Sequence, residues 1–318
     1  HNQVQVVTTG GPPVRIYLEK RTGHAVLPCP AADDRPLDME RINARIELEV
    51  DRLCAEMQDR CDNDAPLNFR FWPSYFAASC GRAWRYWRQD ERLLDILRDV
   101  ADRTLALQRE NGTFSGFHLG RPWSRRDTPH WSGGAYDTGQ VGELWCVAAD
   151  ILGEDKYLAA AERLLQAWST YRVEFNQNYA AFALYHLTAH YRLTQAPLAL
   201  EHARYYAEHL VTPGLLPLGY HAGHNYYSCY GCITLRGMAL LAEVLPRDDA
   251  LRARLVYFCR RMLNQLWQRV EPQATFDSRD RFYVDEPLWF KGLPSAAYVL
   301  ENVDDRSELD RVIRFLTH

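Results

Sequence analysis

The chain of 318 residues is 47% hydrophobic and 25% charged, which provides enough apolar material for one large core or two modest ones and excludes short peptide-like folds. A net charge of −4 argues against the basic surface typical of nucleic-acid-binding proteins. Only three of the 37 basic residues are lysines, so 34 are arginines, whose planar guanidinium groups hold carboxylates in a fixed geometry. The composition therefore favours an anionic ligand over DNA.

The N-terminal segment 1–37 is predicted to form an arm of two short strands, Gln3 to Val7 and Val14 to Leu18, followed by irregular chain. From Asp38, a good N-cap residue, apolar residues recur at helical spacing as far as Cys61. We expect a helix there and one helical catalytic domain over 38–318.

Helical patterns then follow in pairs, separated by loops that are too long to be simple connectors, above all at 110–135, 211–225 and 269–291. The predicted hairpins are 74–88 with 91–109, 136–152 with 155–171, 178–193 with 197–210, 226–244 with 248–268, and 292–302 with 306–316. Such hairpins either stack as an open solenoid or close into an α/α toroid. The loops are unequal, and the first helix of a pair often carries small and aromatic residues all round, as at 75–79. Both features favour an all-α toroid with these first helices as an inner ring.

The strongest local signal is the segment 217–232, which leads into an apolar helix. It contains His221, His224, Asn225, Tyr226 and Tyr227. These side chains supply a base that titrates near neutral pH, an amide donor and two phenols, which are the groups that proton abstraction next to a carboxylate requires. The alternative is a structural role, in which they cap the helix and line a polar pocket.

The same segment also holds metal-ligand residue types, because His221, His224, Cys229 and Cys232 form a His-x-x-His and a Cys-x-x-Cys pair. The spacing matches no standard zinc finger or ribbon, and thiols at the start of an apolar helix are commonly buried. We therefore expect no metal and no other cofactor, with zinc at these four residues as the alternative.

A predicted helix over 176–193 begins with Asn176, Gln177 and Asn178 and places His186 and His190 on one face. Asn176 or Asn178 is a candidate for neutralising a substrate carboxylate. For the histidine pair, a hydrogen-bonded stripe between helices is the preferred interpretation.

Cations alternate with aromatic residues in the segment 118–137, a combination suited to an acidic sugar chain, because arginines hold carboxylates and rings cover the apolar sugar faces. The candidate substrate-binding residues are Arg121, Trp123, Arg125, Arg126, His130, Trp131 and Tyr136, together with Trp289 and Lys291 from a later loop.

Acidic residues near the same loops provide another possible chemistry. Asp137 paired with Asp277 or Glu286 would supply the acid and base of a glycosidase. Alternatively, Asp137 only caps the helix that follows it.

With its repeated hairpins, its aromatic-rich long loops and the His-Asn-Tyr-Tyr sequence at 224–227, the chain from about residue 38 resembles α/α-toroid polysaccharide lyases that act on uronate polymers, such as alginate and glucuronan lyases. The resemblance is one of architecture and residue type. It implies that Asn178 or Asn225, helped by Arg125 or Arg126, neutralises the uronate carboxylate. It further implies His224 or His221 as the base and Tyr226 or Tyr227 as the acid.

The predicted function is therefore β-elimination on a uronic-acid-containing polymer, with an acidic polysaccharide or oligosaccharide as partner and with neither nucleic acid nor a membrane span. The alternatives are a glycoside hydrolase that uses Asp137, a uronyl C5-epimerase, and a non-enzymatic helical-repeat binding module.

Overall fold

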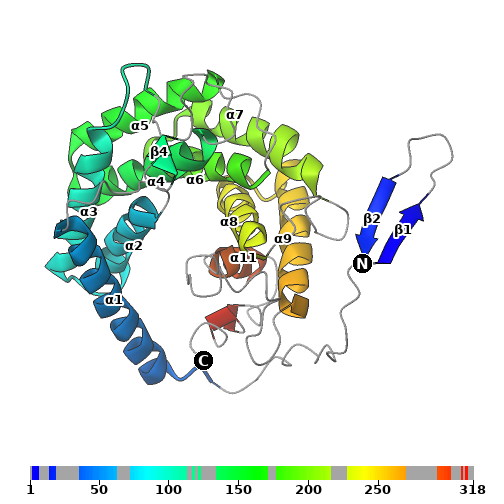
Figure 1. The fold of residues 1–318 in the computed structure, drawn as a ribbon, viewed down its shortest axis with the longest axis horizontal. Helices are drawn as coiled ribbons and strands as arrows, with labels where there is room; N and C mark the ends of the chain where they lie inside the picture. The colour runs from blue at the N-terminus through cyan, green and yellow to red at the C-terminus, as the bar shows by residue number, and fades with distance from the viewer. Residues whose placement is uncertain are drawn as a thin grey trace.

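Helical hairpins follow one another around a ring in a computed structural model of the chain (Figure 1). The structure describes residues 2–6, 14–18, 36–62, 72–112, 117–118, 121–122, 134–170, 177–215, 228–269, 292–301, 309–310 and 312–313. Within these ranges, the order of elements confirms the expected all-α architecture of paired helices.

The helical hairpins agree with the predicted ones to within a few residues at most ends. They are α2 (Trp72–Tyr86) with α3 (Glu91–Leu105), α4 (Gly134–Leu152) with α5 (Asp155–Ala167), α6 (Gln177–Thr194) with α7 (Pro197–Tyr206), and α8 (Ser228–Val244) with α9 (Ala250–Arg269). A fifth inner helix, α11 (Gly292–Glu301), packs against α8, and the described residues of its predicted partner, 309–310 and 312–313, are helical.

The helices α2, α4, α6, α8 and α11 form the inner ring, as the sequence predicts from their apolar character on all sides (Figure 1). Since α5 runs back between α4 and α6, these two inner helices point in the same direction, and the same holds for α6 and α8 across α7. Their first turns therefore lie at one face of the ring.

Two glycines allow α4 and α6 to approach unusually closely. A Cβ atom at Gly139 would lie 2.1 Å from the carbonyl oxygen of Phe182, and one at Gly142 would lie 2.4 Å from Cγ of His186. No larger residue fits at either position unless the helices move apart, so these glycines set the spacing of the inner ring.

The outer helices bury one stripe each, as their sequence periodicity predicts. In α5 this stripe includes Tyr157, Ala161 and Leu164. Glu154 occupies the N-cap position of α5 but makes no side-chain cap hydrogen bond, and its carboxylate pairs with Lys156 at 2.9 Å instead.

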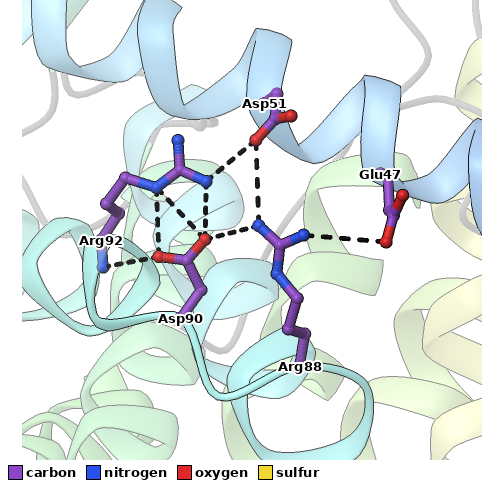
Figure 2. A network of polar contacts seen from close by, with 5 residues as sticks. All are labelled: Glu47, Asp51, Arg88, Asp90 and Arg92. Carbon is purple, nitrogen blue, oxygen red and sulfur yellow. Dashed lines mark hydrogen bonds and ion pairs between the residues drawn. The ribbon is translucent and has the colours of Figure 1, made fainter.

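The first long helix, α1 (Met39–Asp62), begins with the predicted cap, since Asp38 Oδ1 accepts a hydrogen bond from the Arg41 amide at 3.0 Å. Charged side chains then link α1 to the turn between α2 and α3 (Figure 2). Asp51 pairs with Arg92 at 2.9 Å, and Asp90 both pairs with Arg92 and caps α3 through the Arg92 amide at 3.1 Å. This network is exposed, so its net contribution to stability is modest.

Two antiparallel strands, β1 (Asn2–Val6) and β2 (Val14–Leu18), confirm the predicted strands of the N-terminal segment. The division into an arm at 1–37 and a catalytic domain at 38–318 stays a prediction. A second two-stranded pair, β3 (Phe117–His118) with β4 (Arg121–Pro122), lies in a region predicted to be a loop. Among the described helices, none has the length and apolar character needed to cross a membrane.

Candidate functional site

Asn178 lies in the first turn of α6 and is completely buried. Neither its Nδ2 nor its Oδ1 atom has a hydrogen-bond partner among the residues that the structure describes. A buried amide left unpaired costs about 1–3 kcal/mol, so such groups in folded proteins commonly mark a functional position. Of the predicted catalytic residues, Asn178 is the one whose side chain the structure describes, because the others lie in the segment 221–227.

Two neighbouring inner helices carry similar groups near their starts. Ser74 of α2 and Thr138 of α4 are completely buried, and within the described ranges their hydroxyl groups have no partner. Three successive inner helices therefore begin with unpaired polar side chains, at the helix ends where backbone N–H groups also lack partners within the helix.

Deeper in the ring, a buried carboxylate binds two arginines from other inner helices. Glu143 of α4 accepts hydrogen bonds from Arg236 of α8, from Nη1 to Oε2 at 2.9 Å and from Nη2 to Oε1 at 2.5 Å. Arg82 of α2 donates from Nη2 to the same Oε1 at 2.5 Å. We call these three residues the interior charge cluster.

Aromatic rings enclose the buried end of this cluster. The Arg236 guanidinium carbon lies 4.2 Å from the ring centroid of Tyr185 and 5.2 Å from that of Tyr75. The Tyr185 hydroxyl donates to the Ile233 carbonyl at 2.9 Å. Since Tyr75 belongs to α2 and Arg236 to α8, their contact crosses the ring, and side chains fill its interior at this level.

The charges of the cluster stabilise one another. Burial alone would raise the pKa of Glu143, but the guanidinium groups of Arg236 and Arg82 outweigh burial and lower this pKa to about 2. Burial raises the pKa of Tyr185 well above its usual range. Glu143 is thus a carboxylate and Tyr185 a phenol near neutral pH.

The unpaired Asn178 lies above this cluster on the same face of α6 as Tyr185. The two residues are seven positions apart, which is close to two helical turns and about 10 Å along the axis. Tyr75 and Arg82 have the same spacing on α2. Polar groups therefore lie at two levels of the ring, in the first turns of the inner helices and at the charge cluster.

The histidine pair of α6 has the structural role that the sequence favours. His186 is fully buried, and its Nδ1 accepts a hydrogen bond from Trp168 Nε1 at 2.7 Å, which places the ring proton on Nε2. Burial, and then the proximity of His190, lowers the pKa of His186 well below its usual value. The ring is neutral and links α6 to the η1 turn (Trp168–Thr170).

Asp137 lies inside α4 rather than at its cap. The helix begins at Gly134, so the alternative in which Asp137 is an N-cap residue is wrong. The two glycines at 133–134 are typical of a loop, which is why the sequence predicted that the helix begins after them. Asp137 is therefore a position within an inner helix, near the face of the ring where Asn178 lies, and its side chain is not among those that the structure describes.

Most other predicted site residues lie outside the described residues. This holds for the histidine, asparagine and tyrosine set of 221–227, for 123–131 with its arginines and tryptophans, for Trp289 and Lys291, and for Asp277 and Glu286. Arg121 is described only as backbone of β4, while Tyr136 and Cys229 are helical positions whose side chains are not described. Cys232 is buried, and the described residues contain no cluster of metal-ligand side chains.

Comparison with known proteins shows similarity in fold. No protein-family model matches the chain, and no curated protein is significantly similar to it in sequence. The unsaturated glucuronyl hydrolase of Bacillus sp. GL1 is similar with a TM-score of 0.58 at 16% identity, over 82% of this chain and 78% of that chain. A UGL variant described with dGlcA-Glc-Rha-Glc gives 0.54 at 17%, over 68% of this chain and 66% of that chain.

A polysaccharide lyase is also similar, with a TM-score of 0.53 at 14% identity, over 84% of this chain and 83% of that chain. The chain has the α/α-toroid fold. At these identities the likeness extends to the fold alone.

The charge cluster of the toroid is a feature that the sequence interpretation missed. Glu143 and Arg236 lie in the middle of the first helices of two hairpins and are flanked there by apolar residues such as Val141, Leu144, Leu235 and Met238. A charge in such a helix requires a buried partner of opposite sign, and this requirement is the signal that would have paired them.

Proposed function

We propose that this toroid processes oligosaccharides that contain uronic acid, and that it hydrolyses them. The observation that carries the proposal is the position of Asp137 in α4, an inner helix that begins at the same face of the ring as α6 with Asn178. The fold is shared with unsaturated glucuronyl hydrolases, one of which is described as responsible for the degradation of glycosaminoglycan.

The carboxylates whose side chains the structure describes on the inner helices are already bound. Glu143 belongs to the charge cluster, Asp150 pairs with Arg85, and Glu243 pairs with Arg192. Asp137 is accordingly our candidate for the acid that protonates the leaving oxygen of a glycoside. Asp277 or Glu286 would complete the pair of carboxylates, and Asn178 would donate to the sugar or its carboxylate.

Elimination by a lyase is the second candidate, supported by the polysaccharide lyase among the similar structures and by the buried amide of Asn178. In this mechanism an amide and an arginine stabilise the charge that develops on the carboxylate while a base removes the C5 proton. His224 or His221 would be the base, and Tyr226 or Tyr227 the acid.

One assay with two substrates separates these reactions. A lyase acting on an intact uronate polymer creates a double bond conjugated with the carboxylate and increases ultraviolet absorbance. A hydrolase acting on an unsaturated disaccharide releases an unsaturated uronic acid that opens to a keto acid, so absorbance decreases. We expect a decrease with the disaccharide and no change with alginate or glucuronan.

Two variants test whether Asp137 or His224 is required for the reaction. Asp137→Asn is expected to abolish the decrease, and His224→Ala to leave most of it. An absorbance increase on the polymer that depends on His224 would replace the hydrolase proposal with the lyase. A wild-type protein inactive on both substrates would remove both.

A further inference from the structure

We propose that Arg82 forms an anion-binding site inside the ring, with the carboxylate of an acidic sugar as its ligand. The inference deepens the proposed function, because it assigns a binding residue for the acidic part of the substrate. It rests on the balance of charge among the inner helices and on the exposure of Arg82.

The charge cluster has one cation more than it has anions. Glu143 provides a single negative charge to two guanidinium groups, and Arg236 occupies both of its oxygens. Arg82 shares only Oε1 and makes no other ion pair with a described residue. Within the described part of the chain, the cluster therefore carries a net charge of about +1, and Arg82 is the less fully paired of its two cations.

The other basic residues of the inner helices have partners of their own. Arg85 pairs with Asp150, and Arg192 with Glu243. Arg236 is enclosed by Tyr185 and Tyr75. Among the described parts of these helices, Arg82 is thus the cation that remains available to a ligand.

Arg82 is also both accessible and held in place. Its side chain is 37% exposed, whereas that of Glu143 is 1% exposed, so solvent reaches the cluster on the side of Arg82. The bond from Nη2 to Glu143 fixes the guanidinium, and Nε and Nη1 remain to donate to a second anion. A guanidinium fixed in this way loses little entropy when it binds a carboxylate through its planar edge.

The probe for this site is glucuronate, with glucose as the neutral counterpart, and binding to the full chain is measured by calorimetry. We expect wild-type protein to bind glucuronate more tightly than glucose, with an affinity that decreases at high salt. Arg82→Gln should weaken glucuronate binding about 10- to 100-fold and leave glucose unchanged, because it removes a charged hydrogen bond. Arg82→Lys should lose less of the glucuronate affinity, because the positive charge remains.

A matched control is Arg103→Gln on the outer helix α3, where Arg103 is similarly exposed and pairs with Asp99. It should bind glucuronate as the wild type does. If Arg82→Gln fails to fold, the comparison of Arg82→Lys with wild type and the salt dependence decide the question. The inference is overturned if wild type binds glucuronate no better than glucose, or if the folded Arg82 variants bind it like wild type.

These outcomes are distinct from those that test the reaction. A protein that binds glucuronate through Arg82 but does not act on unsaturated disaccharides retains this site and loses the proposed function. A protein that hydrolyses them with unchanged glucuronate affinity in Arg82→Gln retains the function and loses the site.

Discussion

Arg236 and Glu143 form a bidentate ion pair in the interior of the ring, with bonds of 2.9 and 2.5 Å between residues that are 93 positions apart in the chain. The pair joins α8 to α4, which are not consecutive inner helices, since α6 lies between them in the chain. Its energetic value depends on both partners, because the loss of one leaves the other buried and charged.

We therefore expect Glu143→Leu to lower the free energy of unfolding by about 3–5 kcal/mol, because Arg236 loses the one buried counter-charge that it has among the described residues. Urea denaturation monitored by circular dichroism measures this change. The double variant Glu143→Leu with Arg236→Met should recover most of the loss, since apolar residues of similar volume replace a buried pair at little cost. The control Glu243→Gln, which breaks a half-exposed pair, should cost about 0–1 kcal/mol. A single variant as stable as this control would contradict the expectation.

Asn178→Leu is expected to leave the stability unchanged or to raise it by about 1–3 kcal/mol, because it removes a buried amide with no described partner. The same variant should lose activity toward uronic-acid substrates. Thermal unfolding and the absorbance assay measure the two effects. Thr188→Val serves as a control, because the Thr188 hydroxyl is paired within α6 and lies away from the first turn. Marked destabilisation of Asn178→Leu would show that the amide has a structural role.

The close packing around two inner-helix glycines predicts which substitution by alanine destabilises the protein more. Gly139→Ala should destabilise by about 1–3 kcal/mol or more, because the added Cβ meets the Phe182 backbone carbonyl at 2.1 Å, which cannot turn away. Gly81→Ala places its Cβ 2.9 Å from the ends of the Ile151 and Leu97 side chains, which can rotate, and should cost less. Equal losses of unfolding free energy in the two variants would be inconsistent with this packing.

Stability should decrease as the pH falls below about 6.5. Burial lowers the folded-state pKa of both His186 and His190, so in this range the unfolded chain takes up protons that the folded chain does not. The contribution is present in full above the unfolded pKa and is lost between that value and the lower folded one. Each histidine adds a slope of up to about 1.4 kcal/mol per pH unit.

Urea denaturation of wild type and His186→Gln between pH 5 and 8 measures this slope. The unfolding free energy of the variant should depend less steeply on pH than that of the wild type. At pH 8, the difference in unfolding free energy between the two proteins measures the effect of losing the hydrogen bond from Trp168 to His186. Parallel curves would mean that His186 does not contribute to the pH dependence.

Much of the fold was predictable because the outer helices carry a periodic apolar stripe, whereas the inner helices carry apolar and small residues on most sides. The stripe of Tyr157, Ala161 and Leu164 is visible in the sequence, and so is the Asp38 cap. The charge cluster was not predicted, because hydrophobic patterning identifies a buried face but not which residues meet across a ring. Arg82 lies 61 positions before Glu143, and no local rule connects them. The helix that contains Asp137 begins earlier than the N-cap interpretation requires. The glycines at 133 and 134 are typical of a loop, although Gly134 is already helical.

The interior charge cluster also bears on how the protein assembles. In a solenoid, each repeat contacts only its neighbours and can fold as they are added one after another. Here, Arg82 and Glu143 precede Arg236 in the chain and are synthesised first. A chain truncated before α8 would therefore contain Glu143 without Arg236, its buried ion-pair partner. The hairpins should therefore acquire their final packing together, and truncated chains that contain only part of the ring should populate loosely packed, aggregation-prone states.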